Sequence, residues 1–246
     1  MAERSARIVQ LSDTHFSADA GVAPVWQALV ERLHADPPDL VVHSGDIVLE
    51  DPDDAADRTF ALGLMAQLPR PRLVIPGNHD VGGYDVADDA RRSRRVGEFV
   101  EAWGGDRFAV DVAGWRVVGV NAYLLGTAEH DAWLMASCAV DAPVLVFVHQ
   151  PTWGDPRDGW EMAPAASEAF ERAIAGAPVR VIASGHRHCA ATADRGERRS
   201  VWAPSLTLMG EPASAGPELR DVDPRPGFVE HRLAAAGSHA STVVHR

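Results

Sequence analysis

Residues 179–189, VRVIASGHRHC, place two histidines, His186 and His188, at the point where a short apolar run ends. Continuous Val/Ile runs of this length are typical of strands buried on both faces. Alternate residues of an extended segment face the same side, so the two imidazoles can converge on one point. An isolated H-x-H pair is more often a polar strand end facing water than a ligand pair. The neighbouring segments decide between these interpretations.

The same arrangement recurs along the chain. A short apolar run ends in a polar cluster in RIVQLSDTH (7–15), DLVVHSGD (39–46), RLVIPGNHD (72–80) and VLVFVHQP (144–151). Helical patterns lie between several of these runs, at 24–35, 54–67 and 165–175. Alternating strands and helices predict an α/β fold with a largely central sheet. Because ligands bind beyond the carboxyl ends of the strands in such sheets, we expect the five clusters to meet in one cleft.

The remaining segments have less regular patterns. Residues 106–111 and 115–120 predict a hairpin that turns at Ala113 and Gly114, and residues 128–138 predict a helix. Late strands are expected at 198–206, 228–233 and 241–246, the last two as another hairpin. No segment has the composition of a linker, so we expect a single domain over 1–246 with its core in 7–209. The Pro/Gly-rich stretch 210–227 predicts a loop or lid, and segment 210–246 as a whole supplies closing strands, a lid or a homodimer contact.

Composition narrows the class of protein. The chain has 246 residues, of which 46% are hydrophobic and 24% charged, as in ordinary globular proteins. No apolar stretch is long enough to cross a bilayer, and the N-terminus lacks the apolar core of a signal peptide, so we expect a cytoplasmic protein with no membrane partner. A net charge of −12 and the lack of lysine argue against a broad nucleic-acid surface. The one basic cluster, RRSRR at 91–95, is either a solvated helix face or a patch that steers an anionic substrate.

The five polar clusters share one kind of chemistry. They offer carboxylate, imidazole and amide groups from Asp13, His15, Asp46, Asn78, His149, His186 and His188, and no thiolate. This mixture suits divalent Mn, Fe or Zn better than a structural zinc site built from cysteines. Bound cations would also supply the local positive charge that an acidic protein needs in order to handle an anion. The two cysteines are too few for a disulfide framework, although Cys189 could contact a metal or sense oxidation.

The ordered series D-x-H, G-D, G-N-H-D, H and G-H-x-H resembles the calcineurin-like metallophosphoesterase superfamily over residues 8–188. Within it, the small size and the LSDTH and GHRH motifs are most similar to bacterial class III cyclic nucleotide phosphodiesterases. The resemblance implies a four-layer α/β/β/α sandwich with two divalent metal ions. One ion would take Asp13, His15 and His188, the other Asn78, His149 and His186, and Asp46 would bridge both. Two such cations, about 3.5–4 Å apart, clamp the attacking and leaving oxygens, and a water bridging them gives hydroxide near neutral pH.

The residues after Asn78 have separate roles. The resemblance implies that His79 is non-ligating and either protonates the leaving oxygen or stabilises charge on the phosphoryl group. Asp80 either accepts a hydrogen bond from His79 and fixes its tautomer, or caps the turn after G-N-H. In the loop PTWGDPRDGWEM (151–162), Trp153, Arg157 and Trp160 either contact substrate or, for the tryptophans, pack the loop down.

The other histidines are not expected to be metal ligands. We expect His43, inside an apolar run, to be a hydrogen-bonded core residue. The remaining ones lack convergent partners and are expected at the surface or in the hairpin; they are His34, His130, His231, His239 and His245.

The resemblance implies a metal-dependent hydrolase acting on a small phosphodiester such as a cyclic nucleotide. The alternatives are a phosphomonoesterase, a nucleotide pyrophosphatase, and a metal-binding regulatory protein without turnover.

Overall fold

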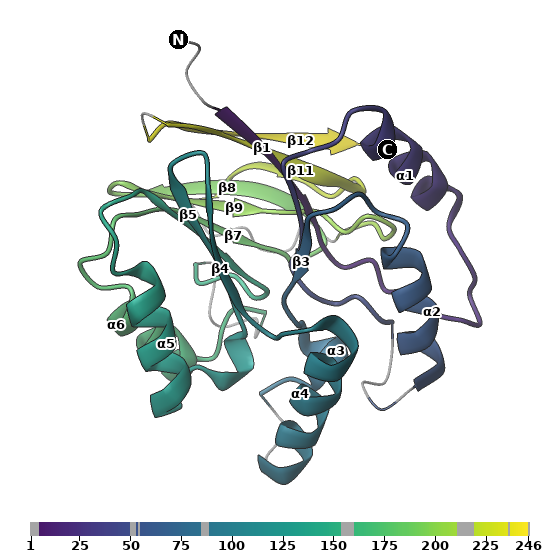
Figure 1. Ribbon diagram of the computed structural model, residues 1–246, viewed down its shortest axis with the longest axis horizontal. Helices are drawn as coiled ribbons and strands as arrows, with labels where there is room; N and C mark the ends of the chain where they lie inside the picture. Colours follow the sequence, from purple (N-terminus) through teal and green to yellow (C-terminus); the bar gives the residue numbers. More distant parts are fainter. Residues whose placement is uncertain are drawn as a thin grey trace.

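The computed structural model describes residues 5–49, 53, 55–84, 89–153, 160–210, 219–235 and 237–245. Two sheets face each other, with helices on their outer sides (Figure 1). The five-stranded sheet has the order β12-β11-β1-β2-β3, with bounds His239–His245, Gly227–Ala234, Ser5–Leu11, Leu40–His43 and Arg72–Val74. The seven-stranded sheet has the order β10-β8-β9-β7-β6-β5-β4, with bounds Arg220–Asp223, Ala190–Arg195, Arg198–Trp202, Val179–Ser184, Val144–Val148, Trp115–Val120 and Phe108–Val112.

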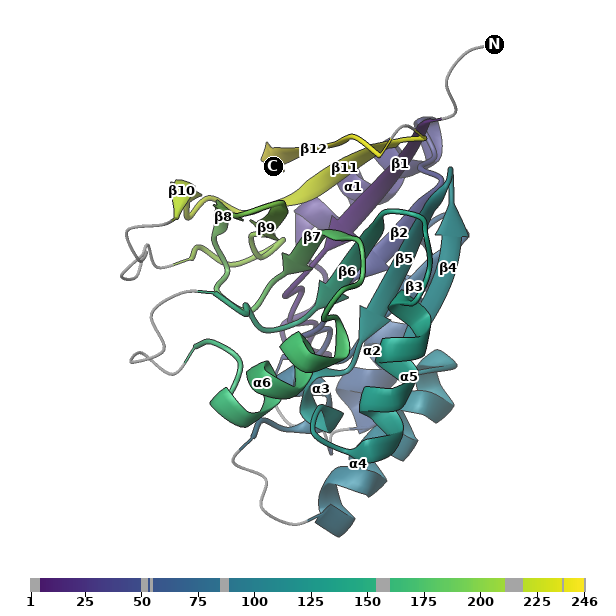
Figure 2. The same ribbon diagram turned by 90° about the vertical axis from the view of Figure 1, so that its left-hand side faces the viewer.

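The helices form the two outer layers. They are α1 (Pro24–Ala35), α2 (Ala55–Met65), α3 (Asn78–Val81), α4 (Asp89–Trp103), α5 (Ala128–Cys138), α6 (Pro164–Ala173) and the 3₁₀ turn η1 (Ala122–Leu124). Helices α1 and α2 lie on the side of the five-stranded sheet, whereas α5 and α6 lie on the side of the seven-stranded sheet (Figures 1 and 2). Both α1 and α6 begin with proline, whose fixed φ suits the first helical position and whose missing N–H costs nothing there. None of the described helices is long and apolar enough to span a membrane.

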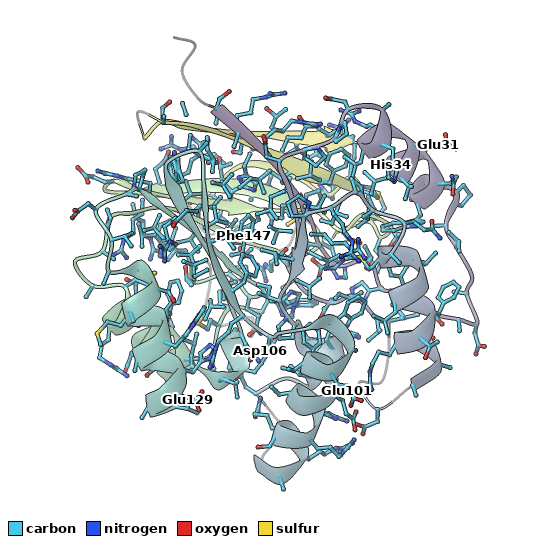
Figure 3. The ribbon with its side chains drawn as sticks, viewed as in Figure 1. Glu31, His34, Glu101, Asp106, Glu129 and Phe147 are labelled. Atoms are coloured by element: carbon cyan, nitrogen blue, oxygen red, sulfur yellow. The ribbon has the colours of Figure 1, made fainter. Side chains whose placement is uncertain are left out.

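Alternation along the buried strands creates three apolar layers. On β2, Val41 packs with the helix-side cluster that contains Trp26 of α1, whereas Leu40 and Val42 face the other sheet. On β6, Val146 belongs to the cluster beneath α5 and α6, whereas Phe147 lies between the sheets (Figure 3). Side chains of successive strand residues point to opposite faces, so a run that is apolar throughout must be covered on both sides. The predicted α/β/β/α sandwich is therefore confirmed.

Most predicted elements have the expected positions. The helices at 24–35 and 128–138 have the predicted bounds, and the hairpin of β4 and β5 turns at Ala113 and Gly114, both with positive φ. The strand predicted at 198–206 is too long, because β9 ends at Trp202. The loop or lid predicted at 210–227 is wrong in part, because β10 within it pairs with β8. Strands β11 and β12 pair with each other, and β11 also pairs with β1, so the described end of the chain extends the first sheet.

A buried hydrogen-bond chain connects this closing hairpin to the strand ends. The Gln10 amide donates to the Ser44 hydroxyl at 2.9 Å and to the Ser184 carbonyl at 3.1 Å, so it joins the two sheets. Its oxygen can only accept, so His231 Nε2 donates to it at 2.9 Å and His231 Nδ1 accepts from His239 Nε2 at 3.0 Å. His231 and His239 thus lie in the closing hairpin, as predicted. The expected surface position of His130 is wrong, since His130 is 1% exposed.

Acidification is expected to destabilise the fold through His231. Burial and the neighbouring His239 hold the pKa of His231 well below its usual value of 6.5. Its contribution to stability is therefore complete above pH 6.5 and is lost as the pH falls, because the unfolded chain takes up a proton that the folded chain cannot. Lowering the pH from 7.5 to 5.5 should reduce the free energy of unfolding of both metal-free wild type and metal-free His231→Gln. The reduction should be about 1.4 kcal/mol larger in wild type than in His231→Gln. Urea unfolding at both pH values measures this difference.

The control for this prediction is His34→Gln, which removes an exposed histidine of α1 (Figure 3) and should preserve the wild-type loss of stability. Equal losses in wild type and His231→Gln would contradict the assignment to His231.

Candidate metal centre

The predicted ligand residues converge at one edge of the sandwich. Parallel pairing of β1 with β2 and of β6 with β7 brings their carboxyl ends together. Asp13 and His15 follow β1, Asp46 follows β2, and His149 follows β6. Asn78 opens α3, and His186 and His188 follow β7. The five polar clusters of the sequence thus meet in one place, because each lies just beyond the carboxyl end of a parallel strand.

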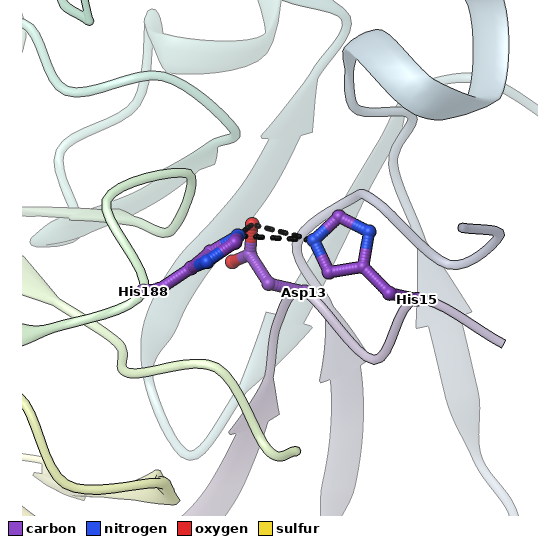
Figure 4. Close-up of side chains that lie close together, drawn as sticks. All are labelled: Asp13, His15 and His188. Carbon is purple, nitrogen blue, oxygen red and sulfur yellow. Dashed lines mark hydrogen bonds and ion pairs between the residues drawn. The ribbon is translucent and has the colours of Figure 1, made fainter. Parts of the chain in front are cut away.

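One group of side chains consists of Asp13, His15 and His188, which point toward one another (Figure 4). His188 Nε2 lies 3.4 Å from Asp13 Oδ1, and His15 Nε2 lies 4.0 Å from the same oxygen. The two Nε2 atoms are 3.0 Å apart. Three potential ligand atoms thus surround one small volume, as a metal site requires.

A second group surrounds His149, whose Nε2 is 3.3 Å from Asp46 Oδ2, 3.2 Å from His186 Nδ1 and 3.3 Å from Asn78 Oδ1. Its Nδ1–H donates to the Ser44 carbonyl oxygen at 2.8 Å, which leaves Nε2 as the nitrogen that can bind a metal once it loses its proton. A backbone carbonyl that fixes the tautomer in this way is characteristic of metal-ligating histidines. Asp46 Oδ2 also lies 3.9 Å from His15 Nε2, which makes this carboxylate the link between the two groups.

The backbone of the site is strained. Asp13, His15, Asp46, His186 and His188 all have positive φ, between 48° and 68°. Residues with a Cβ avoid this region, and it persists only where the surrounding structure enforces it, often at functional sites. Convergent nitrogen and oxygen donors, a fixed imidazole tautomer and an enforced backbone all fit a divalent cation with His/Asp/Asn ligands.

Close packing of the turns leaves no room for larger residues. A Cβ at Gly77 would collide with the Asp46 carboxylate, and one at Gly45, whose φ is +106°, would lie 2.6 Å from His149 Nδ1. These glycines therefore allow the turns after β2 and β3 to approach the ligands closely.

The electrostatics of the site favour added positive charge. Although burial opposes ionisation, contact with His188 lowers the pKa of Asp13, and the charge of His149 lowers that of Asp46. Burial lowers the pKa of His149, but the nearby Asp46 carboxylate more than offsets this and raises it to about 9. Burial, followed by repulsion from His149, lowers the pKa of His186 to about 3. Two buried carboxylates thus depend on a shared positive charge, which a metal ion can provide.

Asp80 serves the backbone and not His79. Its Oδ2 accepts from Gly77 N–H at 2.8 Å, and its Oδ1 accepts from Ile47 N–H at 3.0 Å and from Val48 N–H at 3.3 Å. Burial and the charge of Asp46 raise the pKa of Asp80 to about 7, against these amide bonds. The structure corrects the interpretation of Asp80 as a partner of His79 and selects the capping alternative, because short turns leave these amides without other acceptors.

Asp80→Ala is expected to lower the free energy of unfolding by about 2–3 kcal/mol, because it leaves the amides of Ile47, Val48 and Gly77 without their acceptor. Urea unfolding of the metal-free protein measures this loss. Asp39→Ala is a useful control, since it removes a carboxylate that accepts one exposed backbone amide, from Arg7. A loss for Asp80→Ala no larger than that for Asp39→Ala would contradict the capping role.

His79 lies beside the two groups. Its backbone N–H donates to Asp46 Oδ1 at 2.9 Å, its Nε2 lies 4.0 Å from Asp46 Oδ2, and its side chain is 36% exposed. Its ring packs edge-on against His15 with centroids 4.8 Å apart. His79, His15 and Asp46 form a third compact group, so the geometry leaves His79 within reach of the same cation.

The loop residues predicted to contact substrate have different positions. Trp153 is 6% exposed and packs in the core beneath α6, with Arg195 over its ring at 5.0 Å, so the prediction of a substrate contact for Trp153 is wrong. Arg157 lies outside the described residues. Trp160 lines a cavity of about 290 Å³ together with Asp46, Asn78, His79, His186 and His188.

The sequence analysis did not predict one residue that contacts a candidate ligand. Tyr123 of η1 was not singled out, although its phenol donates to Asn78 Oδ1 at 3.5 Å. The sequence signal that could have identified Tyr123 is the polar N-A-Y that follows the apolar run of β5, a sixth strand end of the same kind.

Burial raises the pKa of the Cys189 thiol to about 11, the opposite of what a metal-binding or oxidation-sensing thiolate needs. The expected core position of His43 is confirmed, since it is fully buried and lies 3.0 Å from Thr14 Oγ1.

Comparisons with known proteins show the family of this chain. The family model of the calcineurin-like phosphoesterases matches residues 6–190. The chain is 31% identical to the glycerophosphodiester phosphodiesterase GpdQ of Enterobacter lignolyticus over 68% of its own length and 64% of that protein's. It is 39% identical to a probable cyclic nucleotide phosphodiesterase of Moraxella catarrhalis over 30% of its length and 27% of that protein's. The alignments thus span less than two thirds of these relatives.

Solved structures show the same fold at low identity. A purple acid phosphatase from yellow lupin matches with a TM-score of 0.70 and 13% identity, over 99% of this chain and 54% of that one. A dimetal phosphatase from Danio rerio matches with a TM-score of 0.62 and 13% identity, over 96% of this chain and 98% of that one.

Proposed function

This chain belongs to the calcineurin-like phosphoesterase family, whose members are metal-dependent, and from this premise we propose that it hydrolyses small phosphodiesters with two bound metal ions. The observation that carries the proposal is the pair of ligand groups that share Asp46. A shared carboxylate holds two cations close enough to act on one phosphoryl group.

The ligands divide between two positions. Asp13, His15 and His188 would hold one ion, Asn78, His149 and His186 would hold the other, and Asp46, which lies near both groups, would contribute to both positions. Imidazole, carboxylate and amide ligands favour Mn, Fe or Zn. Ions held there would supply Lewis acidity to the phosphoryl oxygens and to the attacking water. The neutral amide of Asn78 limits the negative charge that would otherwise repel a phosphate.

His79 acts on the leaving group in this proposal. Its side chain lines the cavity and is partly exposed, so it can reach an ester oxygen, while its backbone amide is bound to Asp46 Oδ1. An imidazole in this position donates a proton to the leaving oxygen or stabilises charge on the phosphoryl group. Asp80 supports this turn by capping it and does not contact the reacting atoms.

Small diesters are the substrate class that the observations favour. The two relatives compared above are named as diesterases, one for glycerophosphodiesters and one for cyclic nucleotides. A cavity of about 290 Å³ suits a small ester and argues against nucleic acid. Phosphomonoesters and nucleotide pyrophosphates are the alternative substrates, and a metal-binding regulator without turnover is the alternative class. A single domain over 1–246 and a homodimer formed through segment 210–246 remain predictions.

Metal analysis combined with hydrolysis tests the proposal. Protein stripped with a chelator and reloaded with Mn, Fe or Zn should bind two equivalents of metal, as measured by plasma mass spectrometry. It should hydrolyse bis(p-nitrophenyl) phosphate faster than p-nitrophenyl phosphate. Faster hydrolysis of the monoester would favour the phosphomonoesterase, and bound metal without any hydrolysis would favour the regulator.

A further inference from the structure

The cavity beside the candidate ligands has one large apolar wall. Trp160 is 45% exposed, whereas Trp115, Trp153 and Trp202 are nearly or fully buried. Its ring lies 5.1 Å from the ring of His186, centroid to centroid, at an interplanar angle of 51°. A large aromatic face exposed beside carboxylate and imidazole groups offers a surface on which a planar group of a ligand can stack.

Arg187 supports this wall from behind. Its guanidinium carbon lies 5.4 Å from the ring centroid of Trp202 and 6.0 Å from that of Trp160, and a guanidinium nitrogen lies 3.7 Å from a carboxylate oxygen of Glu161. Arg187 is 6% exposed and Trp202 is 1% exposed. A planar cation between two aromatic rings is held by both, and here the inner ring is fixed in the core.

The H-x-H segment therefore contacts both the candidate metal positions and the two tryptophans. His186 and His188 face the candidate metal positions, whereas Arg187, between them, lies against Trp202 and Trp160. A phosphoryl group between the ligand groups can direct its ester substituent toward the Trp160 ring, since Trp160 and the ligands line the same cavity.

We propose that Trp160 selects phosphodiesters with a planar aromatic substituent, such as an aryl group or a nucleobase, over esters of polyols, and that Arg187 is the positioning residue that holds Trp160. This inference rests on the proposed function, and it names the substrate class within it. Stacking of an aromatic group on a tryptophan typically strengthens binding about tenfold. Polyol esters gain little from the same surface.

Binding of two phosphonates that cannot be hydrolysed tests the inference without turnover. Phenylphosphonate and cyclohexylphosphonate carry the same anionic head group and differ in whether their ring is planar. By titration calorimetry, the metal-loaded wild type should bind phenylphosphonate about tenfold more tightly than cyclohexylphosphonate. Trp160→Ala should bind the two equally, and Trp160→Phe should retain most of the preference.

Arg187→Gln should reproduce the loss of preference seen in Trp160→Ala while keeping the wild-type metal content. Arg187→Lys should also lose it, because an ammonium cannot stack between two rings as a planar guanidinium does. The matched control is Trp133→Ala, which removes an aromatic ring of α5 whose centroid lies 5.1 Å from the guanidinium carbon of another arginine, Arg107. This variant should keep the wild-type preference.

Equal binding of the two phosphonates by wild type, or an unchanged preference in Trp160→Ala, would overturn the inference. Metal depletion in Arg187→Gln would overturn the positioning role. These outcomes differ from failure of the proposed function, which would appear as metal-loaded wild type that does not hydrolyse bis(p-nitrophenyl) phosphate.

Discussion

Replacing Asp46 by asparagine is expected to lower kcat/KM for bis(p-nitrophenyl) phosphate by roughly 10³-fold or more and to deplete both metals. Asp46 Oδ2 lies 3.3 Å from His149 Nε2 and 3.9 Å from His15 Nε2, so one carboxylate serves both ligand groups. The substitution preserves size and retains an oxygen that can accept the His79 N–H, but it removes the negative charge that two neighbouring cations require. Metal content per chain and steady-state kinetics after metal reloading measure the effect.

Asp106→Asn controls for the general cost of neutralising a buried aspartate. Asp106 is 8% exposed, accepts from the Asn121 amide at 3.0 Å and is not among the residues of the candidate metal groups (Figure 3). This control should keep both metals and wild-type turnover. Two equivalents of metal in Asp46→Asn would contradict the bridging assignment.

His79→Ala is expected to lower kcat by about 10²–10³-fold without changing metal content. The side chain lines the cavity, so its loss removes a proton donor or a charge-stabilising group from the leaving oxygen. Methyl p-nitrophenyl phosphate can lose either methanol or p-nitrophenol. The substitution should reduce kcat more for loss of methanol than for loss of p-nitrophenol, because the poorer leaving group depends more on protonation. Product analysis of both cleavages measures this difference.

Metal analysis distinguishes this role from ligation. His79, His15 and Asp46 form a compact group, so a ligand role for His79 would appear as loss of one metal in His79→Ala. His34→Ala, on the outer face of α1, should leave both metal content and kcat unchanged. Unchanged turnover of metal-loaded His79→Ala would contradict participation in the reaction.

The convergence of the ligands was predictable because it follows from chain direction. Each polar cluster comes directly after a buried apolar run, and parallel strands place such clusters at one edge. The division into two sheets was not predictable from periodicity. Val41 faces the helices and Val42 faces the other sheet, yet both lie in one uninterrupted apolar run. A strand covered by helices on both faces would have the same pattern.

The roles of residues that depend on contacts with distant parts of the chain could not be predicted from the sequence either. Trp153 and Trp160 occur in one loop, but one is 6% and the other 45% exposed, because only the first meets the core beneath α6. The two alternatives for Asp80 were separated by the backbone amides of Ile47 and Val48, which are more than thirty residues away in the chain. Tyr123 reaches Asn78 only because β5 and β3 end at the same edge of the sandwich.

The positive φ angles of the site lower the stability of the folded protein while they hold the ligand side chains in place. They occur at Asp13, His15, Asp46, His186 and His188. Each non-glycine residue in that region costs about 1–2 kcal/mol, which the surrounding packing must offset even when the ligand positions are empty. The folded protein therefore already includes the conformational free energy of this site, so ligand binding does not have to supply it. Selection for heat resistance alone would relax these turns first, and would do so at the expense of the chemistry that they hold in place.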